Sequence, residues 1–216
     1  MDSRFDLVRI LRTAVWVVTS PVHFFKVMPR LGGYLEPLIF MVVMGFIGAS
    51  LQAVFGIVGL QPVELEIDAA SLIIMLTLVI VVSGFVAAAI YFVIWRLMGS
   101  QESFETSFRC NAYISALIPI TTVLNLIPFF APGVSIILST IFLVVASIHV
   151  HRLPPKRSWL VFGALGLIFM MISITSDITV QRLREDIEIQ QGSEGIGIST
   201  GERGMNLGNY TGDLKK

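Results

Sequence analysis

The sequence predicts an all-α membrane protein: a bundle of five transmembrane helices, preceded by an N-terminal amphipathic helix in the membrane interface. Hydrophobic residues make up 55% of the 216 residues and charged residues only 14%, whereas soluble domains have about 25% charged residues. The charges are also segregated, so that several long stretches hold no Asp, Glu, Lys or Arg. Crossing a hydrocarbon core of about 30 Å takes about 20 apolar helical residues, and these stretches are long enough.

Five segments are predicted to cross the membrane. The uncharged stretch 110–148 is too long for one crossing, and Pro128, Pro132 and Gly133 divide it in two with a tight turn between the halves. The five predicted spans, which together form a membrane domain over residues 35–176, are 37–60, 69–98, 112–130, 134–150 and 158–176. Residues 177–216 are polar and glycine-rich, so we expect a partly disordered tail.

Residues 1–34 precede the first span and are expected to lie at the membrane surface. Within residues 3–18, one helical face carries Leu7, Leu11, Ala14 and Val18, and charged residues lie opposite. This pattern is typical of a helix that lies in the plane of the interface.

The basic residues predict the orientation of the chain. Ten of the fifteen Lys and Arg residues lie before the first span, around the loop after the second, or in the loop after the fourth, and the opposite loops hold none. Cytoplasmic loops are enriched in Lys and Arg. We therefore expect a cytoplasmic N-terminus and a C-terminus outside.

Neither an enzyme motif nor a cofactor motif is visible in the sequence. There is no glycine-rich phosphate loop and no Gly-x-Ser-x-Gly. The net charge is zero, so no basic field favours nucleic acid. We expect no enzyme activity, no cofactor, no metal and no nucleic-acid partner. His149 and His151 could bind a metal as a His-x-His pair, but without a visible third ligand they are better interpreted as interfacial histidines.

Polar residues are few within the spans. The spans hold no Lys, Arg, Asp or Glu at mid-membrane, where coupled transporters usually carry such groups. Gln52 and Asn125 either make hydrogen bonds between helices or line a substrate path. Pro119 removes a backbone hydrogen bond from the third span and predicts a kink. Small residues such as Gly45 and Ala49 allow close helix packing within the monomer or, alternatively, a dimer seam.

The loop before the third span holds the strongest candidate residue, Arg109. If residues 103–113 are helical, Glu105 and Arg109 have the i, i+4 spacing of an ion pair. One interpretation is a solvated turn in which Arg109 is only a topology signal. The other is that Arg109 is partly buried at the cytoplasmic end of the bundle and holds this short helix against the loop 151–157.

Several short motifs follow one another in order around the predicted spans. They are Ser20-Pro21, Phe24-Phe25, Met28-Pro29, Glu36-Pro37, Phe108-Arg109, Ala112-Tyr113, Pro128 and the loop sequence His-Arg-Leu-Pro-Pro-Lys at 151–156. In this order, over roughly residues 20–176, the chain resembles the prokaryotic form of the Yip1 domain family. The resemblance implies a five-helix domain in a prokaryotic inner membrane, and it draws attention to Tyr113 and His151.

Two functions fit these observations. The first is a non-enzymatic membrane protein that associates with membrane lipids, with a membrane-protein partner or with copies of itself, in membrane organisation or a trafficking-like role. Its cytoplasmic surface would be the amphipathic helix, the loop 99–111 and the basic loop 152–157. The alternative is a transport or lipid-handling subunit with a path among spans one, three and four, for which Gln52, Pro119 and Asn125 would matter.

Overall fold

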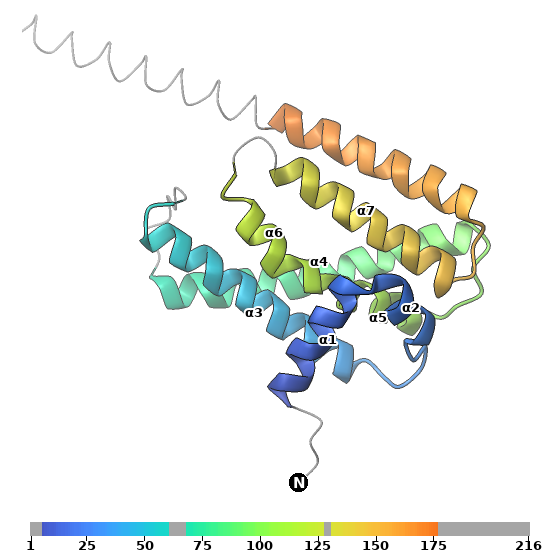
Figure 1. Cartoon of the computed structure of the whole chain (residues 1–216), viewed down its shortest axis with the longest axis horizontal. Coiled ribbons are helices and arrows are strands. Elements are labelled where there is room, and N and C mark those ends of the chain that lie inside the picture. Colours follow the sequence, from blue (N-terminus) through green and yellow to red (C-terminus); the bar gives the residue numbers. More distant parts are fainter. Residues whose placement is uncertain (1–5, 61–67, 128–130, 177–216) are drawn as a thin grey trace, which may run out of the picture. The chain divides into compact units, whose positions relative to one another are not determined.

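The computed structural model describes residues 6–60, 68–127 and 131–176, and this part of the chain is helical without β-strands (Figure 1). The helices are α1 (Leu7–Thr19), α2 (Pro21–Val27), α3 (Leu35–Ile57), α4 (Ala69–Leu97), α5 (Phe104–Ile114), the 3₁₀ turn η2 (Ser115–Leu117), α6 (Ile118–Leu124), α7 (Ala131–His149) and a last helix, Pro155–Ser176. Residues up to Met170 belong to one compact unit, and all contacts below lie within it. The predicted tail 177–216 lies outside the described residues.

Three of the described helices are long and apolar enough to cross a membrane: α3, α4 and Pro155–Ser176. They correspond to the predicted spans 37–60, 69–98 and 158–176. The fourth predicted span corresponds to α7, whose apolar part, Gly133–His149, is shorter. Multiple membrane-spanning helices are thus present, and the count of five stays a prediction.

The third predicted span, 112–130, is not one regular helix over its described residues, and residues 128–130 lie outside them. The helical segment begins earlier, at Phe104, because the side chain of Ser103 caps it by accepting the Thr106 backbone N–H. It then tightens into η2, where Ser115 Oγ donates to the Ala112 carbonyl. Pro119 occupies the first turn of α6, where its missing N–H costs nothing. The expected kink is therefore a 3₁₀ interruption just before the proline.

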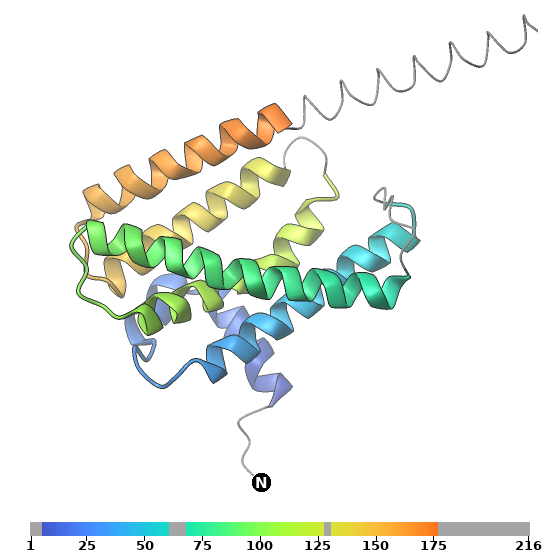
Figure 2. The ribbon, with the colours of Figure 1, turned by 180° about the vertical axis from the view of Figure 1, so that it is seen from behind.

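Helices α3 and α4 pack against each other, and Figure 2 shows them from behind. Glycines make this possible, since a Cβ on Gly45 would lie 3.1 Å from Ile80 and one on Gly84 would lie 2.5 Å from the Met41 sulfur. Ala49 and Ala53 are buried on the same helix as Gly45. The small residues of α3 therefore serve packing within the monomer.

The N-terminal segment is part of the core and not a peripheral appendage. Val17 of α1 and Phe25 of α2 are fully buried, and α2 packs beside α7. The predicted apolar face of α1 divides in two: Leu7 and Leu11 are exposed, whereas Ala14 and Val18 pack against the core. Residues 3–5 lie outside the described residues, and Asp6 caps α1 by accepting the Val8 N–H.

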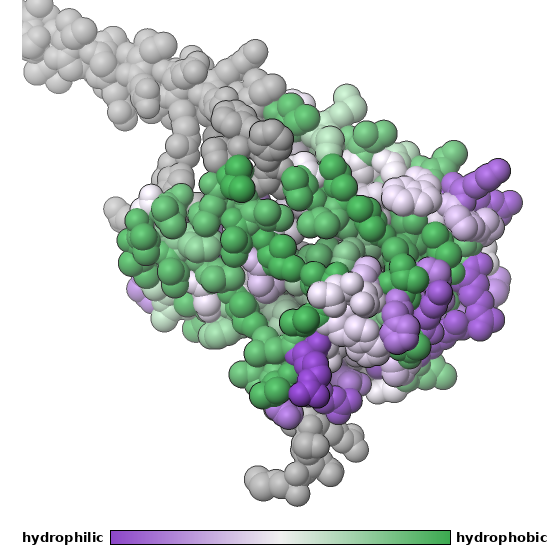
Figure 3. Space-filling view, in the orientation of Figure 1, coloured by the Kyte–Doolittle hydropathy of each residue, from purple (hydrophilic) through white to green (hydrophobic). Residues whose placement is uncertain are grey.

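Figure 3 shows that hydrophobic side chains cover most of the viewed surface of the long helices. Hydrophilic side chains gather at the start of α1 and at the end of the bundle where α2 meets the loop after α7. This second region, the polar end, contains the buried polar residues described next.

Candidate functional site

A group of polar side chains ties the N-terminal segment to α5 and to the end of α7. We call it the polar cluster; its members are Arg30, Ser100, Glu102, Glu105, Thr106, Arg109 and His151. They come from the α2–α3 linker, the α4–α5 loop, α5 and the loop after α7. Helix α5 faces the linker because Ser103 fixes its start and its apolar residues, such as Phe108 and Cys110, are fully buried.

Arg109 is almost completely buried, with 1% of its side chain exposed. Its Nη1 donates to the Gly33 carbonyl at 2.9 Å, and its Nη2 lies 3.6 Å from the Glu36 carboxylate. Its Nε has no hydrogen-bond partner among the described residues. Of the two interpretations of Arg109, the structure supports burial and not the solvated turn. The contact expected with the loop 151–157 is wrong, because Arg109 holds α5 against the start of α3.

Glu105 does not pair with Arg109, so the predicted i, i+4 ion pair is also wrong. One of its carboxylate oxygens instead accepts the backbone N–H groups of Gly32 and Gly33, at 2.8 and 2.7 Å. Both glycines have positive φ, 143° and 84°, and a Cβ on Gly32 would lie 3.3 Å from the Arg109 guanidinium. The sharp turn and the close approach both require glycine. The linker backbone is thus held from two sides, by a carboxylate on its N–H groups and a guanidinium on its carbonyl.

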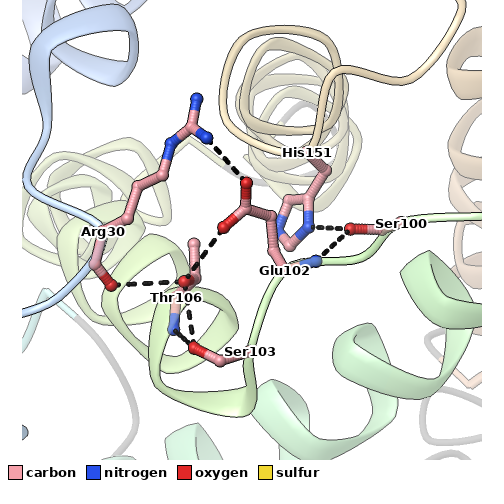
Figure 4. Close-up of polar contacts among 6 residues, drawn as sticks. All are labelled: Arg30, Ser100, Glu102, Ser103, Thr106 and His151. Atoms are coloured by element: carbon pink, nitrogen blue, oxygen red, sulfur yellow. Dashed lines mark hydrogen bonds and ion pairs between the residues drawn. The ribbon is translucent and has the colours of Figure 1, made fainter.

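Arg30 anchors the α2–α3 linker at a position just before the two glycines (Figure 4). Its guanidinium makes an ion pair with Glu102 at 2.7 Å, and its carbonyl accepts the Thr106 hydroxyl at 3.2 Å. Both side chains of the ion pair are at most one-third exposed. The pair is therefore less screened by water than a surface pair.

His151 is buried and stacks on Trp95, with ring centroids 3.9 Å apart and an angle of 22° between the ring planes. Its Nδ1 is 2.8 Å from the Ser100 hydroxyl, and its Nε2 is buried without a partner among the described residues. Burial, with a smaller contribution from the charge of Arg30, lowers the pKa of His151 to about 3. The ring is therefore neutral at physiological pH and packs in the core, which corrects its interpretation as an interfacial histidine.

Tyr113 lies on the same helix as Arg109, one turn further along. Its ring contacts Phe24 of α2 and Phe40 of α3, with centroid distances of 5.0 and 5.1 Å. Edge-on aromatic contacts of this kind stabilise a buried core. Tyr113 thus joins the N-terminal segment to the first long helix.

The polar cluster is suited to holding backbone in place and not to acid–base chemistry. Its charged groups are engaged with linker backbone or with one another. In the described ranges, no group of three or more His, Cys, Asp or Glu residues could hold a metal ion, and His149 and His151 make no such site there.

The residues predicted for a transport path do not line the cavity of the bundle. Gln52 and Asn125 are exposed, and Pro119 lies in the first turn of α6. A cavity of about 470 Å³ does lie among α4, α5, α6, α7 and the last helix, but none of these three residues lines it.

Sequence reasoning missed Trp95, Ser100, Glu102 and Thr106, and it assigned the wrong partner to Glu105. The one usable signal was the pair Gly32-Gly33 in the loop before the first span, because adjacent glycines often mark a close backbone approach. Nothing in the spacing indicates that the carboxylate and guanidinium contacting them lie more than seventy residues away.

Comparison with known proteins identifies one related family. The family model described as Yip1 domain matches residues 16–176. No curated protein and no solved structure matches the chain.

Proposed function

Because this chain is an integral membrane protein of the Yip1 domain family, we propose that it works without catalysis, by association with other components of its membrane. The proposal extends to the expected partners: membrane lipids and a membrane protein, or a second copy of the chain. It places the N-terminus in the cytoplasm of a prokaryotic cell and the C-terminus outside.

The observation that carries this proposal is the division of α1 into two apolar faces. One face, with Val17 fully buried, packs on the core. The other carries four hydrophobic side chains that are between 42% and 62% exposed: Leu7, Val8, Leu11 and Val15. These positions share one side of a helix. An apolar face beside Arg9 and Arg12, with nothing covering it among the described residues, suits the membrane surface or an apolar partner.

The polar cluster supports the same role by keeping this face in a fixed position. Arg109, Glu105 and Arg30 hold the linker that follows α2, and Tyr113 packs on α2 itself. A preorganised surface loses less conformational entropy when a partner binds. Association through α1 is therefore better supported than a transport path through Gln52, Pro119 and Asn125.

A photocrosslinking amino acid placed in α1 of the full-length protein tests this role in native membranes. At Leu11 or Val15 we expect a discrete protein adduct that survives detergent purification. The matched control is Leu160, which is 72% exposed on the last helix and is predicted to face lipid. If the probes at Leu11 and Val15 crosslink only to lipid, as the probe at Leu160 is expected to do, association with a protein through α1 is excluded.

A further inference from the structure

The cavity among the membrane-spanning helices has a lining of unusual chemistry. Its volume is about 470 Å³, and the residues that line it include no Asp, Glu, Lys, Arg or His. Most of the lining is aliphatic or aromatic, from residues such as Ile80, Leu143 and Phe162. Six of the lining residues carry aliphatic hydroxyl groups: Ser83, Ser115, Thr121, Ser135, Ser139 and Thr140.

The volume decides which kind of occupant fits. A spanning helix about 10 Å wide and about 30 Å long fills roughly 2,000 Å³, so the cavity is far too small for the helix of a partner protein. Binding sites for small molecules are about 300–1,000 Å³. The cavity is therefore the size of a site for a small molecule or for part of a lipid, and the surrounding bilayer supplies lipids.

The hydroxyl groups decide the chemistry of its polar end. Ser83, Ser115 and Thr121 each donate their proton to a carbonyl of their own helical segment, so their oxygens can only accept a further hydrogen bond. Ser135 Oγ, on another lining residue, is buried without a partner among the described residues, so this part of the chain does not use its proton. A hydroxyl group on a ligand can donate to one of these acceptor oxygens and accept the proton of Ser135, so it matches both kinds of lining group.

We propose that this cavity binds a neutral lipid alcohol, such as diacylglycerol, with a hydrocarbon chain along the apolar lining. The lipid hydroxyl accepts a hydrogen bond from Ser135 and donates one to the side-chain oxygen of Ser83, Ser115 or Thr121. A charged headgroup is excluded because no lining residue offers a counter-charge at this depth. This ligand site does not depend on the association role of α1.

Photolabelling of the full-length protein in phosphatidylcholine vesicles tests the proposal. One probe is a diacylglycerol with a diazirine in its acyl chain; the other is phosphatidylglycerol with the same chain. We expect diacylglycerol adducts at lining positions of α6, α7 and the last helix, in at least about threefold excess over the charged probe. Equal labelling by the two probes, no labelling, or adducts spread over exposed positions such as Leu160 would each overturn the proposal.

Three variants sharpen the test. Ser135→Ala removes an unpartnered buried hydroxyl, so it should leave the melting temperature unchanged or higher while labelling falls by about three- to tenfold. Ser139→Phe fills the cavity and should also abolish labelling, whereas Leu160→Phe, a control on an exposed face, should not change it. Native labelling of Ser135→Ala would overturn the assignment even if Ser139→Phe failed to fold.

Discussion

At the residue scale, the burial of Arg109 distinguishes it from the other arginines of the polar end. Its guanidinium is compensated by one backbone carbonyl and by a carboxylate that is itself half exposed. Leaving such groups unpaired is costly in a low-dielectric surrounding. The residue therefore links the stability of the linker to that of α5.

Arg109→Ala should destabilise the detergent-purified protein strongly. Loss of a buried, hydrogen-bonded charge costs about 3 kcal/mol or more, which lowers the melting temperature of a chain of this size by about 5–10 °C. Arg157→Ala is the control, because Arg157 is exposed and its loss should cost little. A differential scanning measurement with equal, small shifts for the two variants would contradict the buried role.

His151 predicts a dependence of stability on pH. Its pKa is about 3 in the folded protein and about 6.5 in an unfolded chain, so the unfolded state binds more protons between these values. The contribution of His151 to the free energy of unfolding is therefore fully present above pH 6.5. It decreases as the pH falls, by about 2 kcal/mol at pH 5.

The control for this effect is His151→Phe, which keeps a ring against Trp95 but cannot titrate. Between pH 7.5 and 5 its melting temperature should fall less than that of the native protein. Parallel melting curves for the two proteins across this range would show that His151 does not carry the effect.

At the element scale, the sequence was a good guide to α4, which charged residues bound at both ends. The second span was predicted as 69–98 and α4 is Ala69–Leu97, because Asp68 caps one end and polar residues follow the other. It failed for residues 112–130, where no charge marks the change from α5 through η2 to α6. The partners of Arg109 could not be predicted either, since hydrogen bonds to a linker 76 residues away depend on tertiary packing.

The placement of α1 in the interface gives a prediction for this helix alone. Leu11→Glu puts a charge on its exposed apolar face, and Thr13→Glu adds the same charge elsewhere on the helix. A peptide of residues 1–20 with Leu11→Glu should bind anionic vesicles at least about tenfold more weakly than the Thr13→Glu peptide. Equal vesicle binding in a sedimentation assay would argue that α1 does not lie in the interface.

At the scale of the whole molecule, two topologies differ in how the segment from η2 to α6, and α7 after it, meet the bilayer. If both cross, the chain has five spans; if they enter and return as a hairpin, it has three. The C-terminus lies outside in both cases, provided that the N-terminus is cytoplasmic. A terminal reporter therefore confirms the orientation and does not count the spans.

The five-span topology predicts where a thiol reagent reaches the chain. Asn125→Cys, at the end of α6, should react with a membrane-impermeant maleimide from outside, whereas Gln101→Cys should react only from the cytoplasmic side. The native Cys110 is buried and gives little background. If Asn125→Cys does not react with the maleimide from either side, the hairpin is indicated and the number of membrane spans is three.

The length of α4 has a consequence for the bilayer itself. Its 29 residues extend about 43 Å at 1.5 Å per residue, well beyond a hydrocarbon core of about 30 Å. Since residues 69–95 carry no charge, there is nothing to hold the surplus in water, and hydrophobic mismatch follows. Either the helix tilts steeply or the lipids beside it stretch, and both responses make the energy of the protein depend on membrane thickness. Thicker regions of the membrane should therefore retain it in preference to thinner ones.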